Sequence, residues 1–202
     1  FDIQPLKILG GVQPLLCANL DNTKQDELYL IEPDENQFFS AIQKYHFDAR
    51  GNLIKKNRII LNNFVNQDIQ AIDFINIDYN ADMELAIYTG HNPKVMFFKP
   101  TSENSFTKWS EFSFEETILG NVMESFSRSD ANNDAVEDLI IVPFDGTIRF
   151  LRMDATDIIQ SIIGDLGNRS IHDDLIIVDL DLDGQKEILV VSRQKSGGDS
   201  FE

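Results

Sequence analysis

Four acidic side chains stand close together near the end of the sequence, in the stretch DLDLDGQKEI. They occupy its first, third, fifth and ninth positions, at Asp179, Asp181, Asp183 and Glu187. Carboxylates about 4 Å apart repel by roughly 4 kcal/mol per pair at an effective dielectric near 20, so such a group needs a cation, a proton or more distance. Hard oxygen ligands on a flexible loop suit calcium. The stretch therefore predicts a calcium site.

The residues between the acids indicate how this loop is built. Gly184 supplies a backbone conformation that other residues resist. Leu180 and Leu182 alternate with the acids, so we expect their side chains to turn toward a core. Asp and Asn side chains also cap their own turns by accepting backbone hydrogen bonds, and a turn without an ion therefore remains an alternative.

An EF-hand also opens with D-x-D-x-D-G, but two features exclude it. Its twelfth position requires glutamate, and that position is Val190. The hydrophobic runs on either side, LIIVDLD and EILVVSR, are typical of strands rather than helices.

The acidic stretch is repeated along the chain. Copies begin at residues 19, 76, 130 and 179, and each has Asp or Asn at positions 1 and 3, Asp or Glu at position 9, and then Leu or Ile. A period near 50 residues indicates a repeat architecture. We refer to residues 19–27, 76–84, 130–138 and 179–187 as the first to fourth loops.

The other copies keep these oxygen ligands to different degrees. The third loop has three carboxylates and the second has two, with Ala135 and Ala81 at the glycine position. The first loop has Lys24 there, which should weaken ion binding. The expectation of an ion therefore decreases from the fourth loop to the third, the second and the first. The residues concerned are Asp130, Asn132, Asp134 and Asp138 in the third loop, Asn76, Asp78, Asn80 and Glu84 in the second, and Asn19, Asp21, Thr23 and Glu27 in the first.

Strands and hairpin turns fill the intervals between the loops. Runs rich in Ile, Val and Phe are bounded by turn sequences at Pro33–Asn36, Asp48–Asn52, His91–Lys94 and Phe144–Thr147. Only Ser125–Arg128 and Asp157–Ile163 are candidates for a turn or two of helix. The pattern predicts an all-β protein of roughly 50-residue, four-stranded units, which stack radially in a β-propeller.

The arrangement of a strand, an acidic loop and a second strand resembles the FG-GAP or VCBS-type repeat of integrin-α-like propellers. The resemblance covers all four copies and implies calcium bound by the acidic side chains and by one backbone carbonyl per loop, at Gln185, Val136 and Asp82. We expect residues 1–202 to form one β-propeller domain of about four blades, as part of a larger ring. The alternative is a four-bladed ring whose two ends complete one blade. Phe1–Leu9 looks like the end of a preceding unit.

Composition narrows the function classes. A net charge of −17 disfavours nucleic-acid binding, which needs Lys and Arg. The single cysteine permits no internal disulfide, and no run approaches the roughly 20 apolar residues of a membrane span. His46, His91 and His172 are widely separated, and no nucleophile elbow, phosphate-binding loop or dinucleotide motif is present. We therefore expect a protein that is not an enzyme.

Two functional hypotheses follow. The first is a calcium-stiffened propeller that presents loops to a protein or glycan partner, as an interaction or adhesion scaffold. The second is a carbohydrate-binding or accessory propeller of a secreted enzyme, with the aromatic side chains of FTKWSEFSF as a sugar-stacking platform. Loops of this charge suit millimolar calcium, so we expect an extracellular or cell-surface location. The glycosylation sequon at Asn168–Ser170 agrees with that expectation.

Overall fold

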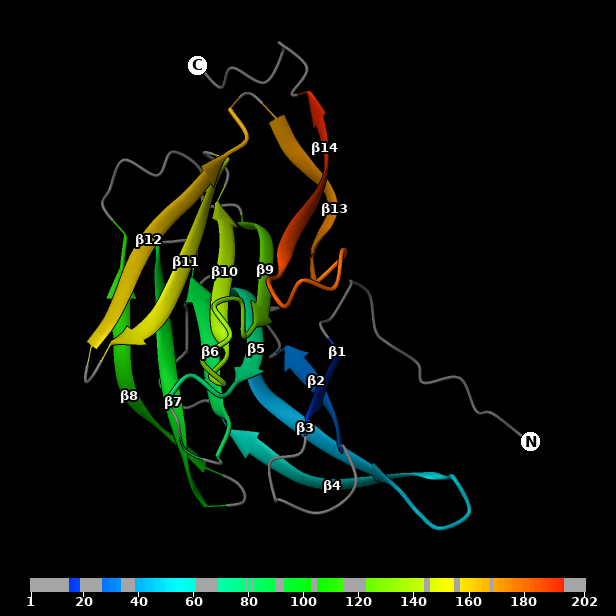
Figure 1. Ribbon diagram of the computed structural model, residues 1–202. Coiled ribbons are helices and arrows are strands. Elements are labelled where there is room, and N and C mark those ends of the chain that lie inside the picture. The colour runs from blue at the N-terminus through cyan, green and yellow to red at the C-terminus, as the bar shows by residue number, and fades with distance from the viewer. Residues whose placement is uncertain are drawn as a thin grey trace. The chain divides into compact units, whose positions relative to one another are not determined.

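The hydrophobic runs form strands in the computed structural model, which is all-β over the residues it describes (Figure 1). Those residues are 15–18, 27–33, 39–60, 69–78, 80, 82–89, 93–102, 105–114, 123–143, 146–154, 157–167 and 169–194. The expected strand at Phe1–Leu9 and most of the first loop lie outside them. Within this part of the chain, no helix is long and apolar enough to cross a membrane.

The chain divides into two compact units, Phe1–Val65 and Asn66–Glu202. The first unit is one antiparallel sheet in which each strand pairs with the next along the chain. Its strands are β1 (Leu15–Ala18), β2 (Glu27–Pro33), β3 (Phe39–Phe47) and β4 (Leu53–Ile60). The predicted hairpin turn at Asp48–Asn52 joins β3 to β4, and Gly51 takes a positive φ of 82° there.

The second unit contains three antiparallel sheets built in the same up-and-down order. Two sheets have four strands, β5 to β8 and β9 to β12, and the last has two, β13 and β14. The strands are β5 (Ile69–Ile75), β6 (Glu84–Thr89), β7 (Lys94–Ser102), β8 (Ser105–Ser113), β9 (Met123–Ser129), β10 (Asp138–Pro143), β11 (Thr147–Asp154), β12 (Asp157–Asp165), β13 (Arg169–Val178) and β14 (Glu187–Gln194).

The sheets of the second unit pack face to face, and β10 shows why its sequence is apolar throughout. Leu139 and Ile141 point to the side where they join Tyr88 and Phe97 of the β5–β8 sheet. The alternate residues of β10 point the other way and pack with Leu175 of β13. Every residue of β10 is therefore buried, as expected for a strand covered on both faces.

Equivalent strands of neighbouring sheets lie together. The first strand of the middle sheet, β9, contacts both β5 and β13, and the last strands β8 and β12 also contact each other (Figure 1). Because the second, third and fourth loops each join the first and second strands of a sheet, this arrangement brings these three loops next to one another.

The two stretches considered for helical turns are strands, so that alternative was wrong. Ser125–Arg128 lies within β9 and pairs with β10, and Asp157–Ile163 lies within β12 and pairs with β11. Ile158, Ile159, Ile162 and Ile163 are β-branched, which favours a strand over a short helix.

The expectation that Leu180 and Leu182 turn toward a core was also wrong. Their side chains are 57% and 86% exposed. The loop backbone does not keep the alternation of a strand, because Leu182 takes a positive φ of 62°. Ile176, Leu189 and Val191 of the two-stranded sheet are exposed as well.

Matched leucine substitutions test this division between core and loop. Leu139 is fully buried between two sheets, so Leu139→Ala should lower the free energy of unfolding by about 2–5 kcal/mol. Leu182→Ala, at a mostly exposed position, should change it by no more than about 0.5 kcal/mol. Urea unfolding measures both, and similar losses in the two variants would contradict the packing described here.

Candidate functional site

The acidic loops lie where the sequence placed them, each between the first two strands of a sheet. The second loop joins β5 to β6, the third joins β9 to β10, and the fourth joins β13 to β14. Position 9 is in every case the first residue of the second strand, at Glu84, Asp138 and Glu187. Glu27 holds the same place at the start of β2, while Asn19, Asp21 and Thr23 lie outside the described residues.

In the fourth loop, the position-1 carboxylate gathers the turn around itself. Asp179 accepts hydrogen bonds from the backbone N–H groups of Asp183, at 3.1 Å, and Gly184, at 2.9 Å. Asp181 also accepts from Asp183, at 3.2 Å, and Asp183 accepts from Gln185, at 2.7 Å. The acids thus cap their own turn, which is the structure expected of the alternative without an ion.

The third loop repeats this scheme residue by residue. Asp130 accepts from the N–H groups of Asp134 and Ala135, at 3.0 and 3.1 Å. Asn132 accepts from Asp134, and Asp134 accepts from Val136, both at 2.9 Å. Two loops of different sequence therefore share one backbone structure.

Positive φ angles recur at the same two positions. Position 4 is Leu182 in the fourth loop and Asn133 in the third, with φ of 62° and 60°. Position 6 is Gly184, at 89°, and Ala135, at 70°. The glycine expected at position 6 thus has a conformational reason, and Ala135 adopts the left-handed conformation at a cost in energy.

The second loop keeps part of the scheme. Asn80 donates its N–H to Asp78 at 3.3 Å, and Asp82 donates to the Asn80 side chain at 2.7 Å. At position 1, the amide of Asn76 donates to the carbonyl of Asn80 at 2.8 Å. The oxygen of that amide is buried without a hydrogen-bond partner, and so is Oε1 of Glu84.

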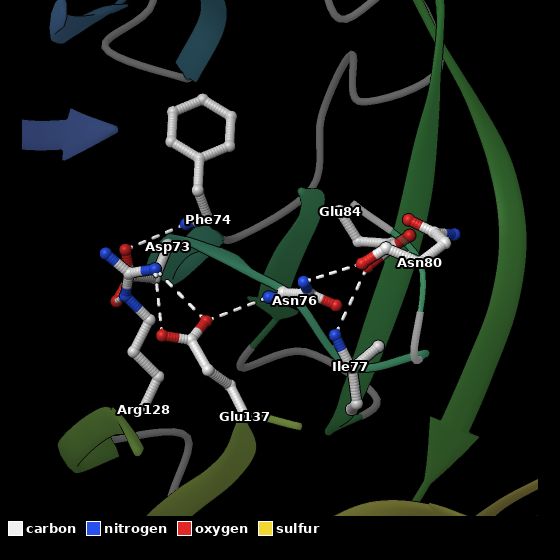
Figure 2. Close-up of polar contacts among 8 residues, drawn as sticks. All are labelled: Asp73, Phe74, Asn76, Ile77, Asn80, Glu84, Arg128 and Glu137. Carbon is white, nitrogen blue, oxygen red and sulfur yellow. Dashed lines mark hydrogen bonds and ion pairs between the residues drawn. The ribbon is translucent and has the colours of Figure 1, made fainter. Parts of the chain in front are cut away.

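The position-9 carboxylate reaches back to position 2 in all three loops. Glu187 accepts from the N–H of Leu180 at 2.7 Å, Asp138 from Ala131 at 3.1 Å, and Glu84 from Ile77 at 3.3 Å (Figure 2). This contact ties the start of the second strand to the end of the first.

Burial raises the pKa of two of the position-9 acids, Glu84 and Asp138. It raises the pKa of Glu84 to about 7, and the carboxylate of Asp78 adds to that rise. It also raises the pKa of Asp138 to about 6, with further contributions from Asp134 and Asp130. Asp138 thus lies among other negative charges, where a cation would be stabilised, whereas the ammonium of Lys99 partly offsets the effect of Asp78 on Glu84.

Three carboxylates of the fourth loop lie closest together. Oxygens of Asp179, Asp181 and Glu187 all lie within 4.8 Å of one another. Asp183 is not in this group, and the acids of the third loop, although described, do not gather within that distance. The set is all oxygen and partly exposed, which fits calcium, and each carboxylate keeps acceptor capacity beyond the backbone bonds described.

Neighbouring loops are joined through position 8, a feature the sequence analysis missed. Glu137 of the third loop accepts the N–H of Asn76 and donates its own N–H to the carbonyl of Asn76, both at 2.8 Å. Arg128 holds the Glu137 carboxylate at 3.2 Å and approaches Asp73 at 3.5 Å (Figure 2).

The third and fourth loops are joined at the same position by a different side chain. Lys186 donates to the carbonyl of Asp130 at 2.5 Å, and Asn133 donates to the carbonyl of Gly184 at 2.5 Å. Position 8 therefore contacts position 1 of the preceding loop in both cases. In the sequence, the only sign of these contacts is a charged residue at position 8, which is negative in the third loop and positive in the fourth.

Comparisons with known proteins give no family for this chain. No family model matches it, and no curated protein matches its sequence. The repeated loop geometry is therefore the basis for a functional proposal.

The strained backbone of Ala135 yields a prediction. Ala135→Gly should raise the free energy of unfolding by about 0.5–1 kcal/mol, because glycine adopts a positive φ without the steric cost. Ala131→Gly is the control, since Ala131 is in the same loop and is not among the residues with positive φ. Urea unfolding without calcium should give a higher free energy of unfolding for Ala135→Gly than for Ala131→Gly. The reverse order would contradict the loop geometry.

The raised pKa of Glu84 predicts a pH dependence. Between pH 4.5 and about 7, the folded chain keeps a proton on Glu84 that the unfolded chain has released, so this group's contribution to stability falls as pH rises. The shift corresponds to roughly 3 kcal/mol. Chemical unfolding in EDTA from pH 4.5 to 7.5 should show a shallower decline in Glu84→Gln than in the wild type. Asp82→Asn, an exposed position of the same loop, should follow the wild type. Parallel curves for Glu84→Gln and the wild type would rule out this role.

Proposed function

We propose that this chain is a non-enzymatic calcium-binding β-propeller built from FG-GAP or VCBS-type repeats, which acts as a protein interaction or adhesion scaffold. The observation that carries the proposal is the repetition of one acidic loop structure between the first two strands of successive sheets. Loops that shared only composition would not be expected to repeat both their hydrogen bonds and their positive φ angles.

The propeller part of the proposal rests on sheet architecture. The two complete sheets of the second unit each have four antiparallel strands in sequence order, as does the sheet of the first unit. Within the second unit the sheets stack face to face with equivalent strands adjacent. Four-stranded sheets repeated around an axis are the construction of a propeller.

The calcium part rests on the chemistry of the loops. In the fourth loop, Asp179, Asp181 and Glu187 would hold the ion, with Asp183 and the carbonyl of Gln185 as the further ligands that the family resemblance implies. The third loop would use the corresponding side chains of Asp130, Asn132, Asp134 and Asp138, with the carbonyl of Val136. Bound calcium would neutralise the acids and hold the loop against the start of the next strand.

The scaffold part is favoured over a sugar-binding platform by the packing of the aromatic strand β8. Phe114, just after β8, is buried in the core, and Trp109 and Phe112 pack against the same cluster. The ring of Trp109 is also covered by the ammonium of Lys99, at 3.8 Å from the ring centroid. We therefore propose a protein or glycan partner that contacts loops at a propeller face, outside the cell, where calcium is millimolar.

Thermal unfolding with and without calcium tests the proposal. Saturating calcium should raise the melting midpoint, since an ion at 100 times its Kd stabilises the folded state by about 2.7 kcal/mol. EDTA should reverse the shift. Asp181→Ala should reduce it, because that substitution removes one of the clustered carboxylates.

Asp157→Ala is the matched control for this experiment, because Asp157 is exposed on β12 and outside the loops. It should keep the full calcium response. A midpoint that calcium leaves unchanged, together with no bound metal detected in the protein, would reject calcium binding and leave the acids as turn caps.

A further inference from the structure

Lys99 of β7 brings a positive charge to the second loop. It follows Phe98, which pairs with Leu85, so it lies across from the position-9 residue Glu84. Its ammonium forms an ion pair with the carboxylate of Asp78 at position 3. Lys99 therefore lies at two of the residues that the sequence predicts as metal ligands, on a side chain that arrives from a neighbouring strand.

The ammonium of Lys99 is held on a second side by an aromatic ring. It lies 3.8 Å from the centroid of Trp109 on β8, a cation–π distance. The Asp78 side chain is only 10% exposed, so the ion pair is shielded from water on the carboxylate side. These contacts define a fixed position for the cation rather than a solvated surface lysine.

The loop nevertheless retains unused oxygens. Oε1 of Glu84, a fully buried residue, and the buried Oδ1 of Asn76 have no hydrogen-bond partner. Buried acceptors without partners are costly, and a cation is one means of satisfying them. The second loop therefore has oxygens suited to an ion together with a lysine that already supplies positive charge.

In the sheet of β9 to β12, the residue that corresponds to Lys99 is an arginine on β11. Arg152 follows Leu151, which pairs with Leu139, so Arg152 lies across from Asp138, yet it is exposed to solvent. In the first unit, by contrast, Lys44 of β3 forms a 2.6 Å ion pair with Glu27, and both side chains are nearly buried. A lysine thus pairs with a loop carboxylate in the first and second loops, whereas the ammonium of Lys186 reaches only the backbone carbonyl of Asp130 in the third.

We propose that Lys99 is a built-in cation that takes the place of a metal ion in the second loop, so that this loop is closed without calcium while the third and fourth loops respond to it. The inference rests on the proposed calcium binding of those two loops. According to this inference, whether the second loop binds calcium is decided by a residue outside the loop, on a strand about 20 residues further along the chain.

Removing the ammonium should turn the second loop into a calcium site. We expect Lys99→Met to melt at a lower temperature than the wild type in EDTA, to recover that loss in calcium, and to bind one more ion per chain by calorimetry. Lys99→Gln provides a second variant if Lys99→Met does not fold. Lys94→Met is the control, because Lys94 is on the same strand and pairs with Glu111 at the surface; its ion count should equal that of the wild type.

The chain's single tryptophan reports on the second loop directly, since Trp109 contacts Lys99. With terbium as the calcium analogue, Lys99→Met should gain Trp109-sensitised emission that the additional substitution Asp78→Asn abolishes. The proposal is overturned if Lys99→Met gains no ion, or if the wild type already gives terbium emission that Asp78→Asn removes.

The two proposals fail in different ways. A wild type that binds no calcium while Lys99→Met binds one ion would reject calcium binding by the third and fourth loops but support the role of Lys99. A wild type that binds calcium and a Lys99→Met variant with the same ion count would reject the role of Lys99 alone.

Discussion

The structure of the loops depends on the hydrogen bond that the position-9 carboxylate accepts from the backbone. In the second, third and fourth loops this acid begins the second strand, is fully or partly buried, and accepts the N–H of position 2, just beyond the first strand. A buried acid is costly unless its charge is compensated, so each loop must supply hydrogen bonds, a proton or a cation at this point.

The loops differ in the groups that compensate the negative charge of the buried acid. A lysine from a neighbouring strand forms an ion pair with Glu27 in the first unit and with Asp78 in the second loop. Glu84 and Asp138 both have raised pKa values, because each is buried beside at least one further carboxylate. In the fourth loop the acids converge on one another. The position-8 contacts at Glu137 and Lys186 then join successive loops, so that ordering one loop would also restrict its neighbour.

The period-50 repeat was enough to predict the all-β class, the strands beside each loop, and the place of the loops between them. It succeeded because strand pairing and turn chemistry are local. Leu180 and Leu182 were misplaced because a positive φ breaks the alternation of a strand. Ser125–Arg128 was misplaced because four residues are too few to distinguish the period of a helix from that of a strand. Lys99 and Glu137 could not be predicted, since their contacts depend on the register between strands and between sheets.

The most direct test of the account is a crystal structure grown with calcium, with the ions located by anomalous scattering. The account predicts a peak bounded by Asp179, Asp181 and Glu187, another within the third loop, and none beside Asp78, where the ammonium of Lys99 lies. The absence of a peak among Asp179, Asp181 and Glu187 at millimolar calcium would contradict the central claim that these repeated loops bind the ion.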